Sequence, residues 1–324
     1  MCKTKVLISF DLPSIYVDRI RNVSTDLDVV QSKDKDSALN LAPDADILFA
    51  GFFSQELFVA AKNLKWIQAW GAGVDRLLVP QVVKSHVVVT NAGGVHPTPV
   101  SEHAIALMLC LCRKLHLCVR NQSERRWTRY ESGESIEQVE ELSGKTVGIV
   151  GLGRIGAELA RKTKCLGMRV IATKRHLSGQ QSASVDLLIR PSNLKKLLAE
   201  SDFVVLTLPL TKETMGMIGE AQLKSMKQTS YLINVSRGKI IQEDKLIEAL
   251  RQGWIAGAGL DTFENEPLPK NNELWSLRNV IITPHIAGLT PYYMDRVTNI
   301  FCENLNRFMH KQSLVNVVDK KLGY

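Results

Sequence analysis

Short runs of β-branched and apolar residues alternate with amphipathic stretches through the N-terminal part of the chain. The apolar runs predict four strands, at 6–10, 47–49, 66–69 and 87–90. The amphipathic stretches predict helices around 14–22, 36–42 and 54–62. Because strands and helices alternate, we expect a parallel sheet whose strands are connected by helices.

A second and clearer series of the same kind begins at Thr146. Six apolar runs predict strands, with helical patterns between most of them, at 146–150, 169–173, 203–207, 231–235, 256–260 and 280–283. Such a series is typical of a doubly wound sheet. The polar stretch 131–141 is interpreted as a surface linker, and 291–314 has the period of a helix that returns to the first domain.

A long apolar stretch from about 99 to 122 separates the two series and predicts a single helix that links two domains. It begins after two prolines, and Ser101 is a suitable N-cap residue. His103 and His116 fall on this helix, and we interpret them as packing or solvent-facing residues rather than ligands.

The length and composition of the chain exclude several classes of protein. The chain has 324 residues, is 45% apolar and carries 41 basic and 33 acidic side chains, for a formal net charge of +8. This length favours two domains. Its apolar runs fall short of the roughly 18 residues that cross a bilayer, and no apolar segment follows Lys3 and Lys5 as in a signal peptide. We expect a cytoplasmic protein without a membrane partner, whose six cysteines are reduced thiols that bind no metal.

Most of the basic excess lies within residues 98–288. The tightest cluster, Arg125, Arg126 and Arg129, is short and is followed by acidic residues, unlike the dense basic runs of nucleic-acid-binding proteins. We therefore expect no nucleic-acid partner. A basic middle segment favours an anionic small molecule instead.

The strand predicted at 146–150 runs directly into a glycine-rich loop, and a helical stretch follows. In this context Gly151 allows a tight turn, Gly153 lets the backbone approach a pyrophosphate, and Gly156 permits close packing of helix on strand. The helix N-terminus would face the phosphates. The pattern predicts a dinucleotide site rather than a structural glycine turn.

The position that would hold the cofactor's ribose lacks its usual acidic residue. An NAD site has an Asp or Glu about 20 residues beyond the loop, yet the chain has none between Glu158 and Asp186, and the second strand of the series ends in Thr173, Lys174 and Arg175. Two cations suit the 2′-phosphate of NADP in charge and donor geometry. The sequence favours NADP as the cofactor. In the alternative interpretation the two cations only face solvent, and NAD is bound through backbone groups.

Three side chains suited to acid–base and anion chemistry follow predicted strands of the second series: Arg237, Glu266 and His285. Ligands of open parallel sheets bind at the carboxyl ends of the strands. A histidine oriented by a carboxylate suits a general acid near neutral pH, and an arginine binds a carboxylate. Taken alone, each of these three residues is interpreted as a loop residue with its hydrogen bonds satisfied. Together on one edge they indicate an active site. His96 stays open between a turn residue and a cleft contact.

Seven ordered motifs give nearly the whole chain a resemblance to the D-isomer-specific 2-hydroxyacid dehydrogenases. They are GAGVD at 71–75, PVSEHAIALML at 99–109, GKTVGIVGLGRIG at 144–156, LPLTKETMGMI at 208–218, NVSRG at 234–238, GLDTFENEPLP at 259–269 and TPHIAG at 283–288. The resemblance implies an α/β fold with two domains, each on a parallel doubly wound sheet. A Rossmann-type nucleotide domain, 98–288, would be inserted in a flavodoxin-like substrate domain formed by 1–97 and 289–324, with catalysis in the cleft between them.

The resemblance also assigns roles. It makes Arg237, Glu266 and His285 the catalytic trio, and it gives the backbone amides of Ala72 and Gly73 to the substrate carboxylate, an anion nest that the flanking glycines make sterically easy. The family's cofactor contacts correspond to residues in the loops that follow the strands. They are Arg154, Ile155, Leu208, Pro209, Thr214, Val235, Ser236, Asp261, Ala287 and Gly288.

One position departs from the family pattern. Lys174 replaces the usual aspartate after the second strand, so a preference for NAD is not carried over, in agreement with the charge argument. Members similar to glyoxylate or hydroxypyruvate reductases often have cations there and use NADPH. We therefore expect an NADPH-preferring reductase that converts a small 2-keto acid to the D-2-hydroxy acid, with the identity of the keto acid left open.

Two other functions use related scaffolds. One is a cofactor-sensing interaction protein like the corepressors that keep this fold and the trio, since fold does not fix function. The other is oxidation of formate or phosphite, and Glu266 disfavours the formate type. The resemblance further implies a homodimer whose contact lies around 99–130.

Overall fold

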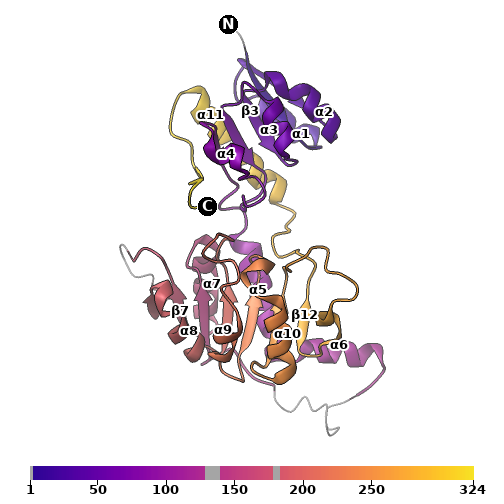
Figure 1. Cartoon of the computed structure of the whole chain (residues 1–324), viewed down its shortest axis with the longest axis vertical. Coiled ribbons are helices and arrows are strands. Elements are labelled where there is room, and N and C mark those ends of the chain that lie inside the picture. The colour runs from indigo at the N-terminus through magenta and orange to yellow at the C-terminus, as the bar shows by residue number, and fades with distance from the viewer. Residues whose placement is uncertain (1–2, 128–138, 178–182) are drawn as a thin grey trace. The chain divides into compact units, whose positions relative to one another are not determined.

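A computed structural model describes residues 3–127, 139–177 and 183–324 of the chain (Figure 1). Contacts divide it into two compact units: unit 1 comprises the residues up to Val95 together with Thr290–Tyr324, and unit 2 comprises His96–Leu289. His96, Pro97 and Leu289, which we had expected in the first domain, thus belong to unit 2. Pro97 already begins a helix of unit 2, and the Leu289 amide donates a hydrogen bond to the Ile286 carbonyl.

Unit 1 is built on a five-stranded parallel sheet in the order β2-β1-β3-β4-β5. Its strands are β1 (Thr4–Ile8), β2 (Leu27–Gln31), β3 (Ile47–Ala50), β4 (Trp66–Ala69) and β5 (Val88–Thr90). Its helices are α1 (Ser14–Arg21), α2 (Lys35–Leu41), α3 (Gln55–Ala60), α4 (Pro80–Lys84) and α11 (Tyr293–Met309), with a 3-10 turn at Ala42–Asp44. This is the strand order of flavodoxin-like sheets.

Helix α11 comes from the far end of the sequence yet lies beside the sheet of unit 1 (Figure 1). Its Phe301 stacks on Phe49 of β3 with ring centroids 4.3 Å apart and lies 5.3 Å from the Trp66 ring of β4. All three side chains are buried. Because burying one such side chain contributes about 1.5–3 kcal/mol, α11 is an integral layer of this core.

Unit 2 contains a seven-stranded parallel sheet in the order β12-β11-β10-β9-β6-β7-β8. The strands are β6 (Thr146–Val150), β7 (Arg169–Thr173), β8 (Leu187–Ile189), β9 (Phe203–Leu206), β10 (Tyr231–Asn234), β11 (Gly257–Leu260) and β12 (Val280–Ile282). The order is that of a Rossmann sheet with one further strand, and it reverses between β6 and β9, where such sheets bind ligands. The two parallel sheets confirm the predicted fold class.

Several helices of unit 2 connect consecutive strands of this sheet. They are α5 (Pro97–Cys112), α6 (Leu115–Ser123), α7 (Arg154–Cys165), α8 (Leu194–Glu200), α9 (Glu220–Lys224) and α10 (Glu243–Gln252), with 3-10 turns at Pro191–Asn193, Gly238–Ile240 and Glu273–Ser276. No helix in the described ranges is long and apolar enough to cross a membrane.

The prediction of one helix over 99–122 is wrong. Lys114 has a left-handed backbone with a φ of 55°, which separates α5 from α6. Ser101 is not the N-cap either, because it lies inside α5 with its hydroxyl donating to the Thr98 carbonyl. The cap position belongs to His96.

Three elements were not predicted. Strand β2 has Asp28 as its second residue, which interrupts the apolar run, and β8 has only three residues at the edge of its sheet. Helix α4 is a single short turn that starts at Pro80. Of the linker predicted at 131–141, residues 131–138 lie outside the described part of the chain.

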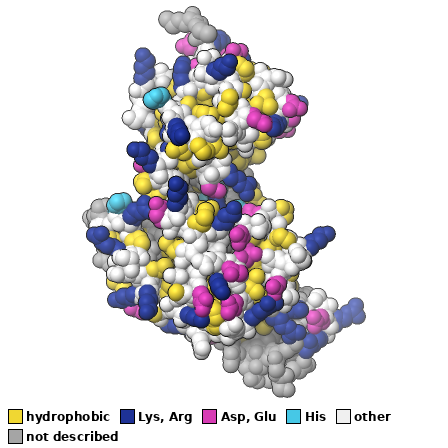
Figure 2. Space-filling view, in the orientation of Figure 1, with side chains coloured by type: hydrophobic (Ala, Val, Ile, Leu, Met, Phe, Trp, Pro, Cys, Tyr) yellow, Lys and Arg dark blue, Asp and Glu magenta, His cyan; other side chains and the backbone are white. Residues whose placement is uncertain are grey.

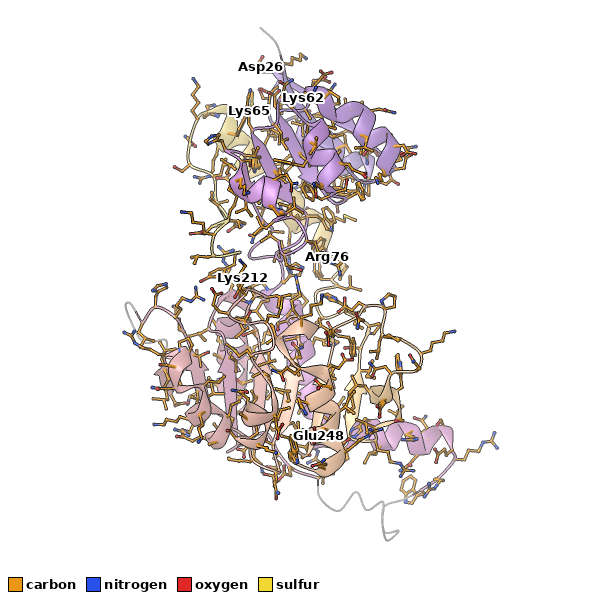
Figure 3. All side chains as sticks on the ribbon, viewed as in Figure 1. Asp26, Lys62, Lys65, Arg76, Lys212 and Glu248 are labelled. Carbon is orange, nitrogen blue, oxygen red and sulfur yellow. The ribbon has the colours of Figure 1, made fainter. Side chains whose placement is uncertain are left out.

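Figure 3 labels residues at both edges of each sheet. In unit 1, Arg76 lies on the loop after β4, whereas Lys65 lies just before β4, at the opposite edge. In unit 2, Lys212 lies on the loop after β9, and Glu248 of α10 lies at the opposite edge. Arg76 and Lys212 therefore mark the carboxyl edges, where ligands of such sheets bind.

Candidate active site

Most of the residues predicted for the site lie at the carboxyl edge of the unit 2 sheet, because they end or follow its parallel strands. Along the edge from β12 to β7 the order is His285, Asp261, Arg237, Leu208, Gly151 and Thr173. Residues that are far apart in sequence thus line one edge on both sides of the point where the strand order reverses.

Glu266 and His285 form a hydrogen-bonded pair. The Glu266 Oε2 atom lies 2.8 Å from Nδ1 of His285, and its Oε1 atom accepts a hydrogen bond of 3.1 Å from the Phe263 amide. The carboxylate is therefore fixed at both oxygens. Because a carboxylate accepts, Nδ1 of the imidazole carries a proton, and Nε2 is the atom left to exchange a proton with a ligand. The His285 side chain is 44% exposed, so such a ligand has access.

The loop that carries Arg237 is held against the loop that carries Glu266. A Cβ on Gly238 would lie 1.9 Å from the carbonyl carbon of Phe263, so only glycine fits where these two backbones touch. The Arg237 backbone is extended, and its Nη1 atom donates to the Ser236 carbonyl at 2.8 Å. This contact holds the loops that carry Arg237 and Glu266 together at the ends of two neighbouring strands.

Asp261 holds the loop that carries His285 in place through hydrogen bonds. Its carboxylate is 1% exposed, and it accepts hydrogen bonds of 2.9 Å from the amides of Ile286 and Ala287. The Asp261 carbonyl accepts a further bond from the His285 amide at 2.9 Å. These contacts hold His285 in a left-handed backbone conformation, with a φ of 54°.

His96 belongs with the residues of this edge. Its ring lies against Gly288, where an added Cβ would be 2.9 Å from the imidazole Cδ2 atom. Burial lowers the pKa of His96, and the charge of Arg237 lowers that pKa further. The ring is thus close to the loop of His285 and within electrostatic reach of Arg237.

The glycine-rich loop between β6 and α7 has a shape that fits a pyrophosphate. Gly151 has a φ of 106°, and a Cβ on Gly156 would lie 2.4 Å from the Gly151 carbonyl oxygen. A Cβ on Gly153 would have no neighbour within 4 Å among the described residues. Among the residues that the structure describes, no side chain caps α7, so amides at its N-terminus offer the donors that anions bind at helix N-termini.

The end of β7 carries the two predicted cations. The Thr173 hydroxyl is buried and accepts the Gly151 amide at 3.0 Å, while Lys174 and Arg175 are exposed. Asp186 cannot serve as the missing ribose ligand, because its carboxylate binds the Val170 amide at the other end of β7. The end of β7 thus carries two cations, and the Glu213 carboxylate on the loop after β9 lies within electrostatic reach of one of them, Arg175.

The remaining predicted cofactor residues lie in the same row of loops. Thr214 is buried, and its hydroxyl donates to the Pro209 carbonyl at 2.8 Å, which folds the loop after β9 beside Leu208. Leu208 in turn lies against the glycine-rich loop, because its Cβ atom would be 2.9 Å from a Cβ on Gly151. The other members of this group follow β10, β12 and the glycine turn: Val235, Ser236, Ala287, Gly288, Arg154 and Ile155.

Ala72 and Gly73 lie in unit 1, on the loop after β4. The Asn91 side-chain amide donates to the Ala72 carbonyl at 2.9 Å, and the Ala92 amide donates to the Gly71 carbonyl at 3.0 Å. Within the described ranges the backbone amides of Ala72 and Gly73 donate no hydrogen bond. The loop is thus braced through its carbonyls and presents two amides.

Comparison with known proteins identifies the family. The model of the D-isomer specific 2-hydroxyacid dehydrogenase NAD-binding domain matches residues 105–287. The chain belongs to this family. The match lies within unit 2, so the Rossmann sheet is the NAD-binding domain of a D-2-hydroxyacid dehydrogenase, and the resemblance read from the seven motifs is confirmed.

Named relatives cover most of the chain. It is 38% identical over 270 residues to a glyoxylate reductase of Pyrococcus furiosus, spanning 83% of this chain and 80% of the relative. A D-isomer specific 2-hydroxyacid dehydrogenase family protein of Aeromonas salmonicida has a similar structure, with a TM-score of 0.85 and 33% identity over 99% of this chain and 100% of that one. An NADPH-dependent glyoxylate/hydroxypyruvate reductase of Sinorhizobium meliloti, in complex with NADP and sulfate, has a TM-score of 0.85 and 26% identity over the same shares.

Proposed function

We propose that this dehydrogenase is an NADPH-preferring reductase that converts a small 2-keto acid to the D-2-hydroxy acid. The observation that carries the proposal is the Glu266–His285 pair, at 2.8 Å, on the same sheet edge as Arg237 and the glycine-rich loop. The activities for which the related glyoxylate and glyoxylate/hydroxypyruvate reductases are named support a 2-keto acid as the substrate class.

In this proposal the three catalytic side chains have separate tasks. A nicotinamide bound along the sheet edge would supply the hydride for C2 of the substrate. His285 donates a proton from Nε2 to the carbonyl oxygen, and Glu266 orients the imidazole through Nδ1. Arg237 binds the substrate carboxylate and polarises the carbonyl.

The amides of Ala72 and Gly73 are proposed as further donors to the carboxylate. They follow β4 at the carboxyl edge of the unit 1 sheet and donate no other hydrogen bond within the described ranges. We accordingly propose that unit 1 contributes to substrate binding and that unit 2 binds the dinucleotide.

The shape of the glycine-rich loop fits a dinucleotide, and the charges at the end of β7 favour NADP. The α7 N-terminus would hold the pyrophosphate, while Lys174 and Arg175 would bind the 2′-phosphate as charge-assisted donors. Asp261 already accepts bonds from two amides, so only its remaining lone pairs are open to the nicotinamide carboxamide.

The deciding experiment is NADPH and, separately, NADH oxidation by the purified protein with glyoxylate, hydroxypyruvate, pyruvate, 2-ketoisocaproate and phenylpyruvate. We expect turnover with NADPH well above that with NADH. His285→Ala should abolish turnover while NADPH still binds, as measured by fluorescence titration. Equal use of NADH would refute the cofactor preference, and no turnover of any keto acid would refute the reductase.

We also propose a homodimer formed through α6. Leu115 and Val119 are 46% and 66% exposed and lie four residues apart on one helix face, and Trp127 beyond the helix is 86% exposed. Light scattering after gel filtration should give the mass of a dimer. Val119→Glu should give a monomer, whereas Val59→Glu on α3, with Val59 61% exposed, should not. A monomeric wild type would refute this assembly.

A further inference from the structure

A chain of hydrogen bonds connects helix α5 to the loop that carries His285. The Nε2 atom of His103 lies 2.9 Å from the Thr283 hydroxyl oxygen, which lies 2.6 Å from Oδ1 of Asp261. The same Oδ1 atom accepts the Ile286 amide at 2.9 Å. His103 is therefore two hydrogen bonds away from the carboxylate that anchors the loop.

The chemistry of the three groups sets the direction of these bonds. The Asp261 carboxylate only accepts, so the Thr283 hydroxyl donates its one proton to it. The hydroxyl oxygen must then accept from His103, which carries a proton on Nε2. His103 Nε2 also lies 3.6 Å from Asp261 Oδ1, so a partial positive charge faces a carboxylate that is 1% exposed.

The position of His103 is fixed by the packing of α5. One helical turn further along, Leu107 packs on β11, where its Cβ atom would be 3.0 Å from a Cβ on Gly259. Glycine at that point lets the helix lie close to the sheet. The His103 side chain itself is 18% exposed, so its surroundings leave it little freedom.

We propose that His103 is a positioning residue for the acid–base histidine, acting through Thr283 and Asp261. The inference rests on the function proposed for His285. Asp261 holds the left-handed backbone of His285 through the neighbouring amides. His103 and Thr283 in turn hold the Asp261 side chain in the rotamer that reaches those amides.

Substitutions of His103 test the donor. In His103→Gln the amide nitrogen can take the place of Nε2, whereas His103→Ala leaves Thr283 without its donor. A small misplacement of a catalytic group can cost about 100-fold in rate, so we expect kcat to fall at least about tenfold in H103A and to recover to within about twofold of wild type in H103Q. The Kd for 2′,5′-ADP, which lacks the nicotinamide proposed to contact Asp261, should stay within about twofold in both variants, since neither touches the glycine-rich loop.

Matched controls come from His116 on α6, whose Nδ1 atom donates to the Cys110 carbonyl at 3.2 Å. H116A and H116Q should leave kcat unchanged. An unchanged kcat in H103A would overturn the proposal, as would an H103Q variant as impaired as H103A while both retain the wild-type melting temperature.

A second readout separates this proposal from the reductase assignment. In histidine-selective ¹⁵N spectra of the protein without substrate, the Nδ1 signal of His285, assigned with an H285N variant, reports its bond to Glu266. We expect the signal to be retained in H103Q and to shift or broaden in H103A. If no keto acid is turned over but this pattern is found, only the reductase assignment fails; an unchanged His285 signal in H103A overturns the positioning role.

A different observation, the register of β8, extends the cofactor site. Thr173 pairs with Ile189, and the Lys174 amide donates to the Ile189 carbonyl at 3.0 Å, so Arg190 emerges beside Lys174 at the carboxyl edge. Adjacent strands lie about 4.8 Å apart. The Arg190 side chain is exposed, and within the described ranges it makes no ion pair or hydrogen bond.

We infer that Arg190 is a third cation for the 2′-phosphate, an inference that rests on the proposed NADP preference. Calorimetry with 2′,5′-ADP and 5′-AMP tests it without turnover. We expect wild type to bind 2′,5′-ADP more tightly, and Arg190→Ala to lose about tenfold in that affinity, the size of one charge-assisted hydrogen bond, with 5′-AMP unaffected. Arg169→Ala removes the same charge at the opposite edge and should have no effect. If the wild-type protein binds 2′,5′-ADP no more tightly than 5′-AMP, the NADP preference is refuted. If R190A still prefers 2′,5′-ADP as strongly as wild type does, the role of Arg190 is refuted.

Discussion

The Oε2 atom of Glu266 lies 2.8 Å from Nδ1 of His285, and the other oxygen of the same carboxylate is held by a backbone amide. The pair joins loops that follow β11 and β12, adjacent strands of one sheet. Because the Glu266 carboxylate is a fixed acceptor for Nδ1, the imidazole ring of His285 is held in one orientation and its Nε2 atom points in a defined direction. This geometry suits general acid–base chemistry and gives the first prediction.

Replacing Glu266 by Gln removes the carboxylate acceptor that orients Nδ1 of His285. General acid–base catalysis contributes about 10²–10⁴-fold, so we expect kcat to fall about 100-fold with the KM for NADPH little changed. Steady-state kinetics checks this. Glu264→Gln, at an exposed carboxylate two residues away, is the matched control, and an E266Q variant with the kcat of E264Q would contradict the assignment.

Gly153 should tolerate a methyl group in the folded protein but not in the complex with the cofactor. A Cβ there has no described neighbour within 4 Å, so Gly153→Ala should change the free energy of unfolding by less than about 1 kcal/mol. The methyl group would stand where a pyrophosphate approaches, and the Kd for NADPH should rise at least about tenfold. Urea unfolding and fluorescence titration measure the two effects; unchanged affinity would remove the pyrophosphate from this loop.

Gly238 should show the opposite pattern. A Cβ at this position would overlap the backbone of Phe263, at 1.9 Å from its carbonyl carbon. Because a backbone cannot rotate out of the way, Gly238→Ala should cost at least about 1–3 kcal/mol in stability and should separate the loops of Arg237 and Glu266. Urea unfolding and kcat together test this, and an alanine variant with wild-type values in both would show that the two loops do not need to touch.

His96 should make the stability of the protein depend on pH. Its pKa is lowered in the folded state, by burial first and by Arg237 second, below the ordinary value of 6.5. The unfolded chain therefore binds the proton more readily, so the stabilisation is fully present above about pH 6.5 and is lost as the pH falls below it. Burial lowers the pKa of His116 as well, which adds a loss of the same sign.

Melting temperatures between pH 7.5 and 5 test this dependence. His96→Gln should reduce the loss of stability on acidification, and His86→Gln, at an exposed histidine, should leave it as in wild type. An acid slope that H96Q does not change would show that His96 is protonated equally in the folded and unfolded chains.

The sequence was sufficient for the fold where apolar runs are long and buried. Strands β4, β6 and β7 have the predicted bounds, because central strands of a parallel sheet are apolar on both faces. Strand β8 was missed for the opposite reason: it is short, half-buried and at the edge. Missing β8 hid Arg190, whose place beside Lys174 depends on strand register rather than on sequence distance.

The candidate site was predictable as far as motifs follow strand ends. Arg237, Glu266 and His285 share one edge because the sheet is parallel. The contact of His103 with Thr283 could not be predicted, because it joins residues 180 apart through the packing of a helix on a sheet. A histidine on an apolar helix carries no sequence mark of such a partner, and we had interpreted His103 as a packing or solvent-facing residue.

The chain order of α11 has a consequence for how the protein is made. The ribosome completes His96–Leu289 before it reaches the helix whose Phe301 covers Phe49 and Trp66. Unit 2 can therefore close its core during synthesis, whereas the aromatic face of the first sheet stays uncovered until the last part of the chain emerges. Nascent chains halted before α11 should accordingly bind chaperones and aggregate through that face.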